Sequence, residues 1–173
     1  MSFPDVVVLG LGNLLLQDEG VGIHALRILQ ENYLFTPQIE LVDGGTSGLD
    51  LLQFFRPESK MIMLDAMLFE QSAGSIGRVE NEDIHARLNT KTSVHHLGLS
   101  DLLAIAKLTD VTPREIVLFG VQPESMELKV ELTKTVNDAI PKLMEYVIQQ
   151  LGEWDVKTST LKNEGKGTTQ ADW

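Results

Sequence analysis

The fold is decided by residues 6–22, which read VVVLGLGNLLLQDEGVG. A short apolar run leads into two glycines, and an acidic pair, Asp18 and Glu19, precedes an amphipathic stretch. This order is typical of the first strand, turn and helix of an α/β domain. A nucleotide-binding loop often occupies this place, but a loop that cradles phosphate needs backbone N–H groups without nearby negative charge. The acidic pair instead favours a metal ion or an activated water.

Two further features of this turn disfavour a nucleotide. The dinucleotide fingerprint needs a third glycine three residues after Gly12, where this chain has Leu15. A phosphate-binding P-loop needs a lysine after its glycines, and none follows here. Nucleotide binding is therefore the weaker interpretation.

Three more apolar runs resemble the first, with helical patterns between them. We expect buried strands at residues 6–11, 39–42, 61–64 and 116–121, and helices near 20–33, 48–55, 99–108 and 133–151. Residues 74–80 add a possible strand, antiparallel or at the sheet edge. Alternating strands and helices predict a three-layer α/β/α sandwich around a mostly parallel twisted sheet. Residues 1–151 form the one predicted domain, and the polar residues 152–173 a disordered tail.

Composition narrows the classes of partner. The chain has 173 residues and a formal net charge of −11, which argues against nucleic acid or an anionic membrane and fits a protein partner with a basic surface. It has no cysteine, so a thiolate metal site and a cysteine nucleophile are excluded. We find no signal-peptide pattern and no apolar stretch near the ~20 residues that span a bilayer. A cytoplasmic protein is expected.

Acidic residues recur where the predicted strands end. Right-handed crossovers place these ends at one edge of a parallel sheet, where ligands of such folds bind. Asp18 is best explained as a cap of the following helix. Glu19 and Asp43 leave structural and functional interpretations open. Asp65 ends a run that should be buried, so it must be paired, protonated or metal-bound, and function is favoured.

Histidines offer one further ligand. His95 and His96 precede the helix at 99–108, whose positive end keeps an imidazole neutral and able to bind a metal. Adjacent loop residues rarely bind the same ion, so at most one is expected to matter, and His24 and His85 are predicted to be structural. Two or three carboxylates with one imidazole suit a divalent transition metal. The same carboxylates can also activate water without metal.

Five short motifs, in this order, carry a family resemblance. They are GLGNLLLQDEGVG at residues 10–22, DGGT at 43–46, LDA at 64–66, HHLGL at 95–99 and GVQPES at 120–125. Together they closely resemble the hydrogenase maturation proteases, the endopeptidases of nickel–iron hydrogenase assembly. The likeness runs from about residue 6 to residue 151.

The resemblance implies an activity and a site. Family members remove a short C-terminal extension from the hydrogenase large-subunit precursor after nickel insertion, which makes that precursor the expected partner of a monomeric protease. The family's metal-contacting residues fall on Glu19, Asp65 and His95, and they are thought to recognise nickel held by the precursor; other divalent metals also suit this set. Glu19, Asp43 and Asp65 are the candidate catalytic acids, as in an aspartyl protease. Whether cleavage is metal-assisted or uses carboxylates alone stays open, as does a non-enzymatic nickel-binding module.

Overall fold

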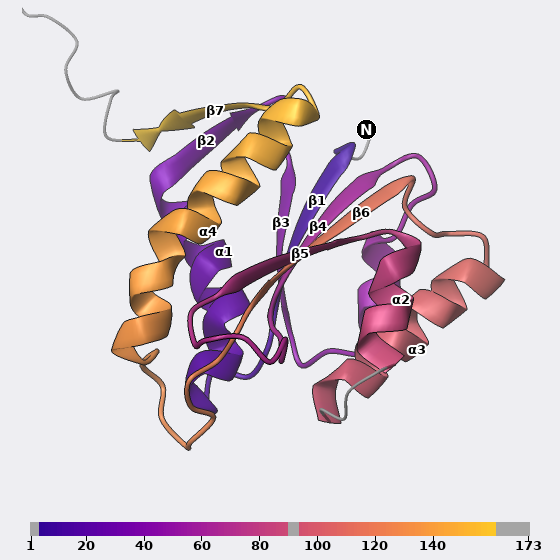
Figure 1. The fold of residues 1–173 in the computed structure, drawn as a ribbon. Helices are drawn as coiled ribbons and strands as arrows, with labels where there is room; N and C mark the ends of the chain where they lie inside the picture. Colours follow the sequence, from indigo (N-terminus) through magenta and orange to yellow (C-terminus); the bar gives the residue numbers. More distant parts are fainter. Residues whose placement is uncertain (1–3, 90–93, 162–173) are drawn as a thin grey trace, which may run out of the picture.

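The computed structural model describes residues 4–89 and 94–161, and of His85, Arg87, Asn89 and residues 94–98 it describes the backbone only. The described chain forms three layers, with a central sheet between two layers of helices (Figure 1). The predicted α/β/α sandwich is confirmed.

The central sheet has five strands in the order β3-β1-β4-β6-β5. Four of them run parallel: β3 (Glu40–Gly45), β1 (Val6–Leu11), β4 (Lys60–Ala66) and β6 (Glu115–Val121). The fifth, β5 (Ile76–Glu80), pairs antiparallel with β6 at the edge of the sheet. All five strands were predicted from the sequence, but β3, which was expected to be buried, is a partly buried strand at the other edge of the sheet.

Two apolar cores fill the spaces between the layers. Helices α1 (Val21–Asn32) and α4 (Lys134–Glu153) cover one face of the sheet, and α2 (Glu82–Asn89) and α3 (Val94–Leu108) cover the other with the 3-10 helix η2 (Leu49–Phe54) (Figure 1). Along β1, Val6 and Val8 enter the core under α1 and α4, whereas Val7 and Leu9 enter the opposite core. Burial on both faces explains why the strand is apolar without interruption.

The C-terminal part of the domain extends beyond its predicted end. Helix α4 continues to Glu153, Trp154 and Val156 are buried in the core under α4, and β7 (Lys157–Thr160) pairs antiparallel with β2 (Tyr33–Thr36). The prediction of a disordered tail from residue 152 is therefore wrong for residues 152–161. The polar composition of this segment predicted disorder, but its two large apolar side chains, Trp154 and Val156, pack into the core and hold it in place. Residues 162–173 lie outside the described part.

All four parallel strands end at the same edge of the sheet, shown at the bottom of Figure 1. The turns after β1, β3, β4 and β6 meet there, as the sequence predicts. Within residues 4–89 and 94–161, no helix is long and apolar enough to cross a membrane.

We expect Trp154→Ala to lower the free energy of unfolding by about 3 kcal/mol or more. The substitution empties a buried site and removes the indole N–H that donates to Glu115 Oε2 at 3.0 Å. Leu108→Ala, at a side chain 83% exposed, is the control and should change stability by less than about 0.5 kcal/mol. Urea unfolding of both variants measures the difference, and equal losses would contradict a structural role for this segment.

Candidate active site

The turn after β1 is packed directly onto the ends of two strands. A Cβ atom at Gly22 would lie 2.0 Å from the carbonyl oxygen of Leu64 and 2.4 Å from that of Leu11, so only glycine fits at the start of α1. Gly12 has a φ of +123°, and a Cβ there would lie 1.8 Å from the Glu19 carbonyl oxygen. Because Asp65 follows Leu64 in β4, this packing brings Glu19 to Asp65.

Asp65 is a buried carboxyl group with a strongly shifted pKa. Burial raises its pKa from 3.8 to about 7, a hydrogen bond from the Ala66 N–H to Oδ1 at 2.8 Å opposes the rise, and the negative charge of Glu19 adds to it. At neutral pH the group can therefore both accept and release a proton. The predicted functional position of Asp65 fits this environment.

Glu19 is also buried, with 6% of its surface exposed, in the 3-10 helix η1 (Gln17–Gly20). A solvated first-turn acid would gain only a few tenths of a kcal/mol from the helix dipole and has no reason to be buried. Burial beside a second carboxyl group is costly unless a cation or a proton is shared at the site. The burial of Glu19 beside Asp65 is compatible with the functional interpretation, which stays a prediction.

Asp18 does not cap the following helix, contrary to the prediction. The residue before α1 is Gly20, and no side chain caps that helix. Asp18 is fully buried and accepts four hydrogen bonds from the loop between β6 and α4: from the backbone N–H groups of Glu124, Ser125 and Thr133 at 2.9, 3.0 and 2.8 Å, and from the Thr133 hydroxyl at 2.9 Å. The sequence signal was ambiguous because a capping acid and a buried acid look alike before a helix.

Asp43 lies at the same edge but apart from this pair. Its side chain is exposed, and Oδ1 accepts from the Gly45 N–H at 3.1 Å. It pairs in register with Gly10, which in turn pairs with Leu64, so its backbone lies two strands, or about 10 Å, from that of Leu64. The structure thus joins Glu19 with Asp65 and leaves Asp43 at the rim of the site.

A narrow cleft opens beside Asp65. Its volume is about 50 Å³, and its walls come from Gly12, the turn at residues 45–48, and Leu99 and Leu102 of α3. This space holds one or two water molecules and no large side chain. The glycine turn that follows Asp43 therefore shapes the cleft, although Asp43 itself does not line it.

His95 lies in the first turn of α3, which begins at Val94, five residues earlier than predicted. Its side chain lies outside the described part of the structure, as does that of His85. By helical spacing His95 is one turn before Leu99, a wall of the cleft. His24 contacts the Val130 carbonyl oxygen through Nε2 at 3.3 Å, in line with the structural role predicted for it.

Gln17 is a residue of this region that the sequence did not single out. Its φ is +51°, which is unusual for a residue other than glycine, and its Oε1 is buried without a hydrogen-bond partner among the described residues. A glutamine in a turn has no diagnostic pattern, so only the backbone geometry reveals it.

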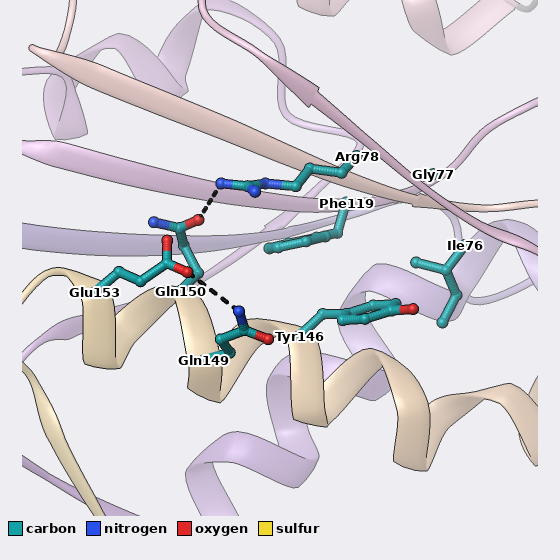
Figure 2. A pocket seen from close by; sticks show the side chains of 8 residues that line it. All are labelled: Ile76, Gly77, Arg78, Phe119, Tyr146, Gln149, Gln150 and Glu153. Atoms are coloured by element: carbon teal, nitrogen blue, oxygen red, sulfur yellow. Dashed lines mark hydrogen bonds between the residues drawn. The ribbon is translucent and has the colours of Figure 1, made fainter.

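A larger cavity of about 270 Å³ lies between β5, β6 and α4, on the opposite face of the sheet from the cleft (Figure 2). Phe119 and Tyr146 stack in it with ring centroids 6.3 Å apart. Arg78 donates to Gln150 Oε1 at 2.5 Å and forms an ion pair with Glu80. None of the predicted site residues lines this cavity, so its size alone does not make it the active site.

The chain is similar to proteins of one known family. A family model described as hydrogenase maturation protease matches residues 23–150. The chain belongs to this family. It is 35% identical to the hydrogenase 2 maturation protease of Escherichia coli over 153 residues (88% of this chain and 93% of the relative), and 37% identical to the hydrogenase expression/formation protein HoxM of Cupriavidus necator over 143 residues (79% and 71%).

Solved structures of the family share the fold. The hydrogenase maturating endopeptidase HybD from E. coli superposes with a TM-score of 0.87 at 33% identity, covering 91% of this chain and 98% of that one. The maturation protease HybD from Thermococcus kodakarensis gives 0.68 at 26% identity, covering 84% and 97%. This family member is therefore a hydrolase, an endopeptidase.

Replacing Asp18 tests its bracing role. Asp18→Ala leaves three part-buried backbone N–H groups and the Thr133 hydroxyl without their acceptor, so we expect a loss of about 2–4 kcal/mol in the free energy of unfolding. Asp43→Ala removes an exposed acid with one local hydrogen bond and should cost less than about 1 kcal/mol. Chemical denaturation measures the free energy of unfolding of both variants. Similar losses in the two variants would contradict the structural role assigned to Asp18.

The pKa of Asp65 makes a pH-dependent prediction. Between pH 3.8 and about 7 the folded protein holds a proton that the unfolded chain releases, so the Asp65 contribution to stability falls as pH rises through this range, by up to about 4 kcal/mol. Asp65→Asn removes the loss. Relative to the unchanged protein, its Tm should rise progressively from pH 4 to pH 8. A difference in Tm that is constant over pH would refute the shifted pKa.

Proposed function

We propose that this protease removes the C-terminal extension of a nickel–iron hydrogenase large-subunit precursor after nickel has been inserted. The observation that carries the proposal is the buried pair of Glu19 and Asp65 at the carboxyl edge of the sheet. The family and the name of the E. coli relative supply the class of substrate. We also propose that the reaction takes place in the cytoplasm and that the protease acts as a monomer.

Nickel enters this reaction as part of the substrate. Carboxylate oxygens and an imidazole nitrogen suit nickel, and we assign Glu19, Asp65 and His95 as the groups that contact it. The charges of the two carboxyl groups support this set of ligands. The negative charge of Glu19 raises the pKa of Asp65, and a divalent cation between them would lower it and release the proton. A precursor without nickel offers no such compensation.

The same carboxyl groups serve hydrolysis. An attacking water forms a C–O bond at the scissile carbonyl and gives up a proton, the C–N bond breaks, and the leaving amine takes a proton. Asp65, ionised once the nickel has displaced its proton, would accept the first proton and return it to the amine. Glu19 is the second acid of the pair, and Asp43 assists water from the rim or shapes the cleft through its glycine turn.

The proposal predicts which substitutions stop processing. Glu19→Gln, Asp65→Asn and His95→Gln should each lower the cleavage rate by about 100-fold or more while the fold is kept, because each removes a group that contacts nickel or the reacting atoms. His96→Gln is the matched control for His95→Gln and should cleave normally. Asp43→Asn separates its two roles: a loss of kcat indicates water activation, and a change in KM alone indicates shaping of the cleft.

The assay mixes purified protease with the large-subunit precursor, with and without nickel, and weighs the products by mass spectrometry. Loss of a C-terminal peptide only from the nickel-loaded precursor is expected. Normal processing by both Glu19→Gln and Asp65→Asn would overturn the site, and no cleavage by the unchanged protein would overturn the function.

A further inference from the structure

Four exposed apolar side chains flank the turn that carries Glu19. They are Leu15, Met126, Leu128 and Val130, which are 59, 40, 80 and 53% exposed, and we call them the apolar rim. Leu15 belongs to the turn after β1, and the other three belong to the loop between β6 and α4, shown in orange at the bottom of Figure 1. A group of solvent-exposed apolar side chains near a candidate site is typical of a surface that binds another molecule.

Backbone pairing joins the two segments of the apolar rim. Leu16 and Lys129 form a parallel β-bridge, in which the Lys129 N–H donates to the Leu15 carbonyl oxygen at 3.1 Å and the Gln17 N–H donates to the Lys129 carbonyl oxygen at 2.8 Å. Leu15 is thereby held beside Leu128 and Val130, which flank Lys129. The rim is a single surface rather than four scattered side chains.

The loop alternates apolar and charged residues in sequence, although its backbone bends at residues 127, 128, 130 and 131 and forms no strand. Met126, Leu128 and Val130 alternate with Glu127, Lys129 and Glu131. An ion pair of 2.9 Å between Glu127 and Lys129 places these two side chains together. The apolar and the charged side chains of residues 126–131 are all exposed.

Buried polar groups hold this loop in place. Asp18 binds both ends of it with four hydrogen bonds, and His24 contacts the carbonyl oxygen of Val130. The bridge also fixes Gln17 at a φ of +51°, a conformation that costs free energy. These contacts hold the loop in one conformation in which its apolar side chains stay exposed to solvent. A surface fixed in this way before binding loses little conformational entropy when a partner binds, as expected of a binding surface.

We propose that the apolar rim docks onto the folded body of the precursor, next to the extension that is removed. This rests on the proposed function and names the surface that recognises the partner. Leu15 and Glu19 belong to the same short segment between β1 and α1, which ties the docking surface to the site. Glu127 is paired with Lys129, and the exposed acids Glu124 and Glu131 of the same loop leave it with net negative charge, so the partner surface is an apolar patch bordered by basic side chains.

The experiment measures cleavage kinetics of nickel-loaded precursor with the Leu128→Asp, Val130→Asp double variant. Two buried apolar contacts are replaced by desolvated charges, so KM should rise at least about 20-fold while kcat changes less than about twofold. Leu108→Asp, an equally exposed leucine at the opposite edge of the sheet, is the matched control and should leave both constants unchanged. Leu128→Asn with Val130→Thr repeats the test without added charge and should raise KM by a smaller factor.

The outcomes separate this proposal from the function on which it rests. If the unchanged protein does not cleave the precursor, the proposed function fails. If it cleaves and the double variant keeps its KM, or loses kcat instead, the docking surface is wrong and the function stands. Light scattering gives the remaining outcome: a dimer of the unchanged protein that the double variant abolishes would assign the rim to self-association and overturn the proposal. Circular dichroism confirms that each variant is folded.

Discussion

The site depends on the contact between the start of α1 and the ends of β1 and β4. At Gly22 the helix backbone lies so close to the strands that a single methyl group would come within 2.0 Å of the Leu64 carbonyl oxygen. This contact leaves the chain no room for a long turn, so residues 17–20 form one tight 3-10 turn above the sheet. Glu19 is thus buried where β4 delivers Asp65. Any side chain at position 22 would push the helix outward and separate the two acids, whatever its chemistry.

Burying two acids together stores free energy that a cation can release. Ionised Asp65 suffers from desolvation and from the charge of Glu19, and its pKa of about 7 measures that penalty. In the proposed reaction the nickel of the precursor replaces a proton at this pair. The repulsion between the two carboxylates, which is unfavourable without a cation, then favours binding of the nickel-loaded precursor. A check on nickel insertion then requires no separate sensor, because the acids that contact the metal are those that move the proton.

The sequence predicted what depends on local pattern and missed what depends on distant contacts. Continuous apolar runs identified β1, β4 and β6 because these strands are buried on both faces, and the shorter apolar run at 39–42 identified β3, which is a partly buried edge strand. The strands β2 and β7 were missed: each is four residues long, and they are stabilised by pairing with each other across more than a hundred residues. Asp65 was singled out correctly as a buried acid, whereas Asp18 was assigned to its own helix when its partners lie at residues 124–133. Hydrogen bonds of that separation leave no trace in a single sequence.

The dimensions of the site explain why recognition must lie largely outside it. A cleft of about 50 Å³ holds one or two water molecules and offers too little apolar surface to bind a protein tightly. Most of the affinity for a large partner must therefore come from the surrounding turns, and Asp18 fixes two of these to each other with four hydrogen bonds. This acid sits one residue before Glu19, so the same 3-10 turn positions the chemistry with one carboxylate and the docking loop with the next. A shift in either would move the other, which couples correct docking to correct alignment of the scissile bond.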